Sequence, residues 1–145
     1  MTKQTGYEVR LPISDGARAI IMDAVNTLQK VCHGDAVNAG WHDDIKTGLP
    51  RTQEQRHEMF PVRLMLIVSE LGEAMEGHRK GLMDDKLPHR SMAEVELADT
   101  CIRAFDLAGE MGFDLAGAIV EKLEYNRNRA DHKLENRAKA GGKAY

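Results

Sequence analysis

Hydrophobic and polar residues follow one another along most of the chain with the spacing of α-helices. Apolar positions recur at intervals of three and four residues in four segments, at about 15–39, 61–80, 91–112 and 114–129. Ala, Leu, Met, Glu, Lys and Arg dominate these segments, and the β-branched alternation of strands is nearly absent. The pattern predicts an all-α fold.

Residues that favour helix starts mark the ends of the predicted elements. Ser14 precedes the first helix, Ser91 with Glu94 forms a capping-box pattern before the third, and Asp114 precedes the fourth. Pro61 suits the first turn of a helix, so the second helix is predicted to begin there. Helices joined by short connections are typical of bundles, and we expect a four-to-five-helix bundle.

Three polar segments separate or follow the predicted helices, at 42–58, 81–90 and about 130–145. The first holds Gly48 and Pro50 and is predicted to be a loop that includes at most a short turn of helix, and Thr52 with Gln55 resembles a capping box. The last is a polar tail. A chain of 145 residues fits a single domain with a core, so we expect one domain over the whole length.

Composition narrows the class of protein. Hydrophobic residues are 42% and charged residues 30%, as in ordinary globular proteins. The net charge of −3 gives no global attraction for a nucleic acid polymer or a membrane surface, and no apolar run approaches the ~20 residues that span a bilayer. The first ten residues lack the apolar core of a signal peptide. Cys32 and Cys101 lie far apart in apolar-patterned segments and are expected to be reduced, buried thiols. We expect a cytoplasmic protein.

Two glutamates in the second predicted helix are candidate metal ligands. Glu70 and Glu73 are three residues apart and therefore share a helix face. They lie off the main apolar stripe, on an arc that borders a second apolar surface. The main stripe comprises Leu64, Ile67, Val68, Leu71 and Met75. Two partly buried like charges are costly unless a cation compensates them. The alternative is an amphipathic helix with glutamates at its margin.

A second acidic pair, Glu96 and Asp99, lies in the third predicted helix, on a charged stripe with Arg103, Asp106 and Glu110. Such a stripe is usually a solvated face, and Asp99 with Arg103 fits a simple i,i+4 ion pair. If the two helices pack antiparallel, however, both acidic pairs converge. Converging carboxylates form a hard oxygen site suited to Mg²⁺ or Mn²⁺. No Cys/His cluster has the ligand spacing of zinc.

The fourth predicted helix carries a polar triad on one face, formed by Lys122, Asn126 and Arg129 at spacings of four and three. Cationic groups near a metal site suit a polyphosphate, which bridges both. The alternative is a solvated basic helix end, which the helix dipole favours.

The only tryptophan, Trp41, offers a flat face on which a nucleobase can stack. His33 and Asn38 precede it and could hydrogen-bond a base edge. The alternative is a tryptophan in the core, which is common for a single large aromatic residue.

Four segments resemble, in order, the MazG-like superfamily of all-α nucleoside triphosphate pyrophosphohydrolases. They are His33 through Trp41, Ser69-Glu70-Leu71-Gly72-Glu73-Ala74-Met75-Glu76-Gly77, Glu94-Val95-Glu96-Leu97-Ala98-Asp99-Thr100-Cys101-Ile102-Arg103, and Glu121-Lys122-Leu123-Glu124-Tyr125-Asn126-Arg127-Asn128-Arg129. The resemblance spans roughly residues 20 to 145. It departs at Ala130, where many relatives have Pro, and at 140–143, where many have His-Gly-x-Lys.

The resemblance implies Mg²⁺-dependent hydrolysis of an NTP or dNTP to the monophosphate and pyrophosphate, with Mn²⁺ as a substitute ion. It implies metal ligands at Glu70, Glu73, Glu96 and Asp99, with Glu73 as the candidate to activate water. It implies substrate-binding residues at His33, Asn38, Trp41, Lys122, Asn126, Arg129 and Lys143. Relatives commonly form homodimers or homotetramers, and we expect the same here.

Two alternatives to a general pyrophosphohydrolase stay open at this stage. One is a related enzyme with a narrower substrate, such as a dCTP, dUTP or phosphoribosyl-ATP pyrophosphatase. The other is a non-catalytic helical module that binds a nucleotide or a partner protein and keeps the acidic residues for structure.

Overall fold

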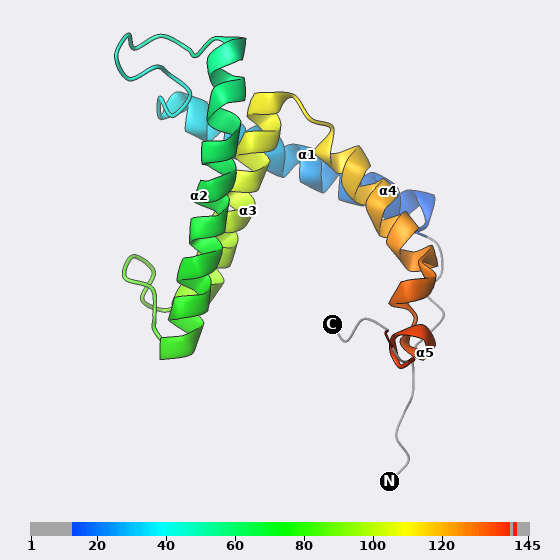
Figure 1. Cartoon of the computed structure of the whole chain (residues 1–145). Helices are drawn as coiled ribbons and strands as arrows, with labels where there is room; N and C mark the ends of the chain where they lie inside the picture. The colour runs from blue at the N-terminus through cyan, green and yellow to red at the C-terminus, as the bar shows by residue number, and fades with distance from the viewer. Residues whose placement is uncertain (1–12, 140, 142–145) are drawn as a thin grey trace. The chain divides into compact units, whose positions relative to one another are not determined.

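A computed structural model of the chain describes residues 13–139 and 141, and its regular elements are helices (Figure 1). They are α1 (Asp15–Asn38), α2 (Gln53–Lys80), α3 (Met92–Met111), α4 (Leu115–Asn128), the 3₁₀ turn η1 (Ala130–His132) and α5 (Leu134–Arg137). The described part of the chain contains no strand, only two isolated β-bridges. The predicted all-α fold is therefore confirmed. No described helix combines the length and the apolarity that crossing a membrane requires.

The chain divides into two compact units, and each is described by itself. Unit 1 comprises the described residues up to Val25 together with those from Leu115 onward, and unit 2 comprises Asn26–Asp114. In unit 1, Ala116 and Val120 of α4 are fully buried. An ion pair between Arg18 and Glu124 joins α1 to α4.

The second helix begins at Gln53, so the predicted start at Pro61 and the predicted loop up to residue 58 are wrong. The capping box at Thr52 explains the difference. The Thr52 hydroxyl accepts from the Gln55 backbone N–H at 3.3 Å, and the Gln55 side chain accepts from the Thr52 N–H at 2.9 Å. Two otherwise unpaired donors are satisfied at this point. Pro61 consequently lies inside the helix.

The other helix ends lie close to the predicted ones. The Ser91 hydroxyl accepts from the Glu94 N–H at 3.2 Å at the start of α3, although the Glu94 carboxylate pairs with Arg90 instead of closing a capping box. Helix α3 ends at Gly112, which adopts the left-handed conformation that glycine tolerates best (φ 67°). The Ser14 hydroxyl caps α1 by accepting from Ala17 N–H at 3.2 Å.

Helices α2 and α3 form an antiparallel hairpin in unit 2 (Figure 1). The least exposed residues of α2 along this hairpin recur at spacings of four and three, which defines a single helix face. They are Arg63, Ile67, Glu70, Ala74 and Gly77. On α3, Glu96 and Asp106 are buried, and the Glu110 side chain is only 1% exposed. We call the acidic and basic residues between the two helices the charged seam: Arg63, Glu70, Glu96, Arg103, Asp106 and Glu110.

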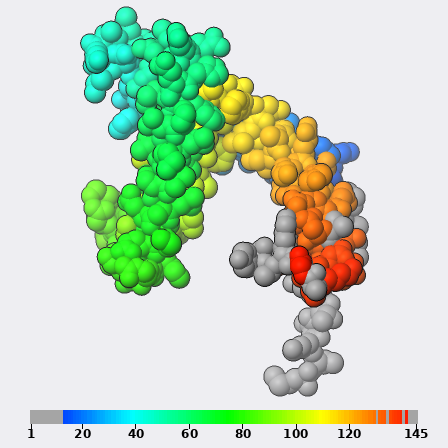
Figure 2. All heavy atoms as spheres, viewed as in Figure 1, coloured from blue at the N-terminus to red at the C-terminus, as the bar shows by residue number. Residues whose placement is uncertain are grey.

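Much of the apolar surface of the hairpin points outward, although Leu107 and Ala108 of α3 are buried, and Figure 2 shows α2 uncovered on the side in view. Four members of the predicted main apolar stripe are 42–68% exposed: Leu64, Val68, Leu71 and Met75. The reading of the α3 charged stripe as a solvated face is also wrong, because that stripe pairs with α2. Cys101 is exposed and Cys32 is half-buried, so the expectation of two buried thiols is wrong for Cys101, which lies on the uncovered side of α3.

Within unit 2, a glycine allows the C-terminal part of α1 to approach α3 closely. A Cβ atom added at Gly109 would lie 2.5 Å from His33 Cβ, closer than real Cβ contacts allow. Gln29 of α1 also donates to the Phe113 carbonyl at 3.0 Å, just beyond the end of α3. This approach brings His33 to the charged seam.

Candidate functional site

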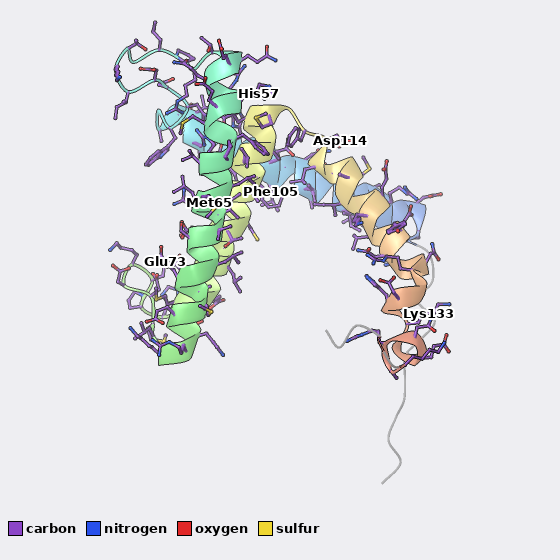
Figure 3. All side chains as sticks on the ribbon, in the orientation of Figure 1. His57, Met65, Glu73, Phe105, Asp114 and Lys133 are labelled. Atoms are coloured by element: carbon purple, nitrogen blue, oxygen red, sulfur yellow. The ribbon has the colours of Figure 1, made fainter. Side chains whose placement is uncertain are left out.

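Three carboxylates from two helices converge at one end of the charged seam. Glu70, Glu73 and Glu96 each offer an oxygen that lies within 4.8 Å of the others. Figure 3 labels Glu73 on the part of α2 that runs beside α3. The antiparallel hairpin therefore brings together three of the four predicted metal ligands. Asp99, one turn further along α3, is half-buried and is not part of this group.

The three carboxylates differ in their access to solvent. Glu70 and Glu96 are buried, with 6% and 8% of their surface exposed, whereas Glu73 is exposed. The two buried groups are held between the helices, since each lies on the stripe that faces the other helix. Glu73 lies at the rim, where a solvent water or a substrate can reach it.

The crowding of acidic groups shows in the protonation of Glu96. Burial is the largest of the effects that raise the pKa of Glu96 to about 7, and a hydrogen bond with Glu70 and the charges of Glu73, Glu70 and Asp99 supply the rest. Each of these effects penalises the ionised form of Glu96. A bound cation would relieve the same repulsion that a proton relieves here.

Arg103 supplies one positive charge to this cluster. Its Nε lies 2.6 Å from Glu70 Oε1 on the facing helix, so the i,i+4 pair with Asp99 that the sequence also allowed is not its contact. One guanidinium faces three converging carboxylates and a fourth nearby, which leaves the cluster with an excess of negative charge. The Arg103 side chain is 44% exposed, so this pairing is also accessible to water.

The donor set fits a hard divalent cation. Carboxylate oxygens are the ligands that Mg²⁺ and Mn²⁺ prefer, and Mg²⁺ sites commonly use a few carboxylates and complete their coordination with water or phosphate oxygens. Two buried ligands and one exposed ligand leave open positions on the solvent side. The described residues are therefore compatible with the predicted Mg²⁺ site.

A second group of potential ligands lies at the other end of the charged seam. His33, His42 and Asp106 each offer an atom within 4.8 Å of the others. The sequence spacing did not indicate this group, because its members come from α1, the loop after α1 and α3. His42 stands beside polar residues in Trp41-His42-Asp43-Asp44, so the sequence gives no sign that its side chain is buried.

The distances identify this second group as a hydrogen-bonded network. Asp106 Oδ1 lies 3.0 Å from His33 Nδ1 and 2.7 Å from His42 Nε2. Ligand atoms around a tetrahedral zinc ion are about 3.3 Å apart, because each lies about 2.0–2.1 Å from the metal. Arg63 moreover occupies the other oxygen of Asp106, with NH1 at 3.2 Å. A cation is therefore already present where a metal ion would bind.

The candidate base-binding residues lie in unit 2 near this network. Trp41 is 71% exposed, so its alternative role as a core residue is wrong, and its indole is free to contact a ligand. Asn38 is exposed at the end of α1. His33 uses Nδ1 in its contact with Asp106, which leaves Nε2 as the ring nitrogen that could meet a base.

The candidate phosphate-binding residues lie in unit 1. Lys122 Nζ lies 4.7 Å from the centre of the Tyr125 ring, and the guanidinium carbon of Arg129 lies 5.7 Å from it. Both cations therefore contact the same aromatic ring. Arg129 also pairs with Asp131, which raises the pKa of its guanidinium. Asn126 Oδ1 is buried and has no hydrogen-bond partner among the described residues. Lys143 lies outside the described residues.

Comparison with protein-family models, curated proteins and solved structures finds no match to this chain.

Proposed function

We propose that this chain is a divalent-metal-dependent pyrophosphohydrolase that converts a nucleoside triphosphate to the monophosphate and pyrophosphate. The observation that carries the proposal is the convergence of Glu70, Glu73 and Glu96 between α2 and α3. Their excess negative charge, seen in the raised pKa of Glu96, favours a cation at this point. The resemblance of the acidic and basic segments to the MazG-like superfamily supports the same activity.

In this proposal, Glu70 and Glu96 would hold Mg²⁺ or Mn²⁺ from within the seam, and Asp99, one turn further along α3, would complete the ligand set. When bound, the ion polarises the phosphate oxygens, neutralises charge developing on them and makes a bound water more acidic. Glu73 is the exposed carboxylate at the rim, and its role is to orient the attacking water and accept its proton.

The proposed reaction is a single displacement at the α-phosphorus. The oxygen of water forms a bond to that phosphorus, and the bond from the phosphorus to the α,β-bridging oxygen breaks. Pyrophosphate leaves with the electron pair, and the proton from water passes to Glu73 and then to solvent. Lys122, Asn126, Arg129 and Lys143 are proposed to bind phosphate oxygens, and Trp41 is proposed to stack on the base, with His33 and Asn38 at the base edge.

We further propose that the chain functions as a homodimer or homotetramer. The outward faces of α2 and α3 carry large apolar side chains, including Met65 and Val68 at 62% and 51% exposure and Leu97 and Ile102 at 52% and 48%. Contiguous exposed apolar surface of this kind marks interaction sites. A helix hairpin that turns its charged side inward leaves this surface to be covered from outside.

A turnover assay tests the proposed activity. Pyrophosphate release is measured from a panel of canonical and modified NTPs and dNTPs, with Mg²⁺ or Mn²⁺, and the panel also separates a general enzyme from a dCTP, dUTP or phosphoribosyl-ATP pyrophosphatase. We expect Glu70→Gln and Asp99→Asn to lower Mg²⁺-dependent turnover by about 100-fold or more while helicity stays unchanged.

Glu76→Gln is the matched control for the two variants. Glu76 lies on the same helix, but its carboxylate pairs with Arg79 and Lys80 away from the cluster. Full activity in Glu70→Gln and Asp99→Asn, or equal loss in Glu76→Gln, contradicts the assignment. Calorimetry with Mg²⁺ and a non-hydrolysable nucleotide distinguishes binding without turnover, the non-catalytic alternative.

A further inference from the structure

The exposed indole of Trp41 is attached to a segment of backbone that is held unusually firmly. Trp41 follows the turn at Gly40 (φ 77°), and its N–H donates to the Ala36 carbonyl at 3.0 Å. The next residue, His42, is only 8% exposed. A largely exposed aromatic side chain therefore directly precedes a buried polar residue. Contacts with α2 and α3 hold the backbone at this point.

Two arginines bind the carbonyl oxygen of Trp41. Arg51 NH1 donates to it at 2.9 Å and Arg63 NH2 donates at 3.1 Å. Arg63 belongs to α2, and the rest of its guanidinium faces α3. Its NH1 lies 3.2 Å from Asp106 Oδ2, and its Nε lies 2.8 Å from Glu110 Oε2. One side chain therefore joins the loop, α2 and α3.

His42 is held by the same two carboxylates. Its Nε2 lies 2.7 Å from Asp106 Oδ1, and its Nδ1 lies 3.0 Å from Glu110 Oε1. The Glu110 side chain is 1% exposed and the His42 side chain 10%. Polar contacts in such a buried setting are little weakened by water, so they restrain the backbone more strongly than surface pairs do.

We propose that Arg63 is a positioning residue for Trp41. Its planar guanidinium holds the Trp41 carbonyl and both α3 carboxylates at once, and this fixes the backbone that presents the indole as a stacking surface for a planar aromatic ligand. The nature of that ligand, a nucleobase, rests on the proposed function. The anchoring itself does not.

Lysine at position 63 is the informative change. An ammonium group keeps the positive charge that the two buried carboxylates need, but it is a compact charge that cannot reproduce the planar fork across three partners. Arg63→Lys should therefore fold and yet release the Trp41 carbonyl. Arg51→Ala removes the other donor to the same carbonyl without touching Asp106 or Glu110, and we expect a smaller effect.

Trp41 is the only tryptophan in the chain, so its fluorescence reports on this loop alone. We expect time-resolved anisotropy without nucleotide to show at least a twofold larger fast component in Arg63→Lys than in the unaltered protein. Arg79→Lys, which changes an exposed arginine at the far end of the same helix, is the matched control and should show no change. An unchanged fast component in Arg63→Lys overturns the proposal.

A second measurement ties the anchoring to ligand binding. Quenching of Trp41 fluorescence by a non-hydrolysable nucleoside triphosphate should give a Kd about 5–10-fold higher for Arg63→Lys. In the turnover assay KM should rise by a similar factor while kcat stays within about twofold, as expected when a binding interaction is lost and the chemistry is untouched. A fall in kcat at constant KM contradicts a positioning role.

The two proposals fail in different ways. If the unaltered protein neither hydrolyses nucleotides nor shows nucleotide-dependent quenching, the proposed function is wrong, and the anisotropy comparison still decides whether Arg63 anchors Trp41. If turnover is normal and Arg63→Lys leaves anisotropy unchanged, the enzyme assignment stands and the anchoring is wrong.

Discussion

We predict that Glu96 makes the stability of unit 2 depend on pH and on divalent ions, and the size of the pH effect follows from its pKa. Its pKa is about 7 in the folded chain, compared with 4.5 for an unperturbed glutamate. The folded state therefore binds a proton that the unfolded state has released between these two values. This contribution to stability is complete below pH 4.5 and is lost as the pH rises through 7.

The difference corresponds to about 3 kcal/mol in full, of which about 1 kcal/mol falls between pH 6 and pH 8. Without metal, the free energy of unfolding should therefore be higher at pH 6 than at pH 8 by this amount relative to Glu96→Gln. The amide keeps the shape and the hydrogen bond of the protonated acid but cannot ionise. The comparison with the variant subtracts the effect of every other ionisable group.

Urea unfolding followed by Trp41 fluorescence measures this quantity in unit 2. With EDTA, the pH effect should be larger in the unaltered protein than in Glu96→Gln. With millimolar Mg²⁺ at pH 8, the unaltered protein should become more stable and its pH effect should shrink, because a metal ion and a proton compete for the same carboxylate. Glu94→Gln, an exposed site on the same helix, should behave as the unaltered protein does.

Equal pH effects in the unaltered protein and Glu96→Gln, within about 0.3 kcal/mol, would refute the reasoning about the carboxylate cluster. Equal stabilisation of both by Mg²⁺ would show that the ion binds elsewhere.

Three further predictions concern packing and assembly. Gly109→Ala places a methyl group against His33, and urea unfolding should show a loss of about 1–3 kcal/mol. Thr52→Ala removes the α2 capping box and should cost about 1 kcal/mol, whereas Thr52→Ser should cost much less. In light scattering after size-exclusion chromatography, we expect a dimer or tetramer, and Met65→Lys with Val68→Lys should convert it to a monomer with unchanged helicity.

Each of these predictions has an outcome that contradicts it. A urea unfolding curve that is unchanged in Gly109→Ala would mean that α1 does not approach α3 as closely as described. A Thr52→Ser variant as unstable as Thr52→Ala would show that the hydroxyl cap does not start α2. A monomeric unaltered protein would refute the proposed oligomer, and an oligomer that survives the double lysine change would place its interface elsewhere.

Local signals allowed most helix ends to be predicted. Serine caps at Ser14 and Ser91, and the glycine at Gly112, act through hydrogen bonds and backbone conformations within one turn, which adjacent residues decide. The misplaced start of α2 came from giving Pro61 more weight than the capping box at Thr52. Proline is common in the first turn of helices, but Pro61 lies inside α2, where it lacks a backbone N–H to donate and yet does not end the helix.

The faces of the helices could not be predicted in the same way. Periodicity shows which residues share a face, and it correctly grouped Glu96 with Asp106 and Glu110. It does not show which face meets a neighbouring helix. Apolar stripes normally face the core, yet here ion pairs between Arg63 and α3 and between Arg103 and Glu70 place the charged side within the hairpin.

The sequence by itself therefore determined the all-α fold, the approximate helix ends and the two acidic pairs, because each depends on residues a few positions apart. Only the tertiary structure decided that three of these carboxylates meet and that Trp41 is exposed. It also decided that His33 and His42 share one oxygen of Asp106, 73 and 64 residues away along the chain. The physical reason is that such contacts depend on how the helices and the loop between them pack, and spacing within a single helix carries no record of its partner.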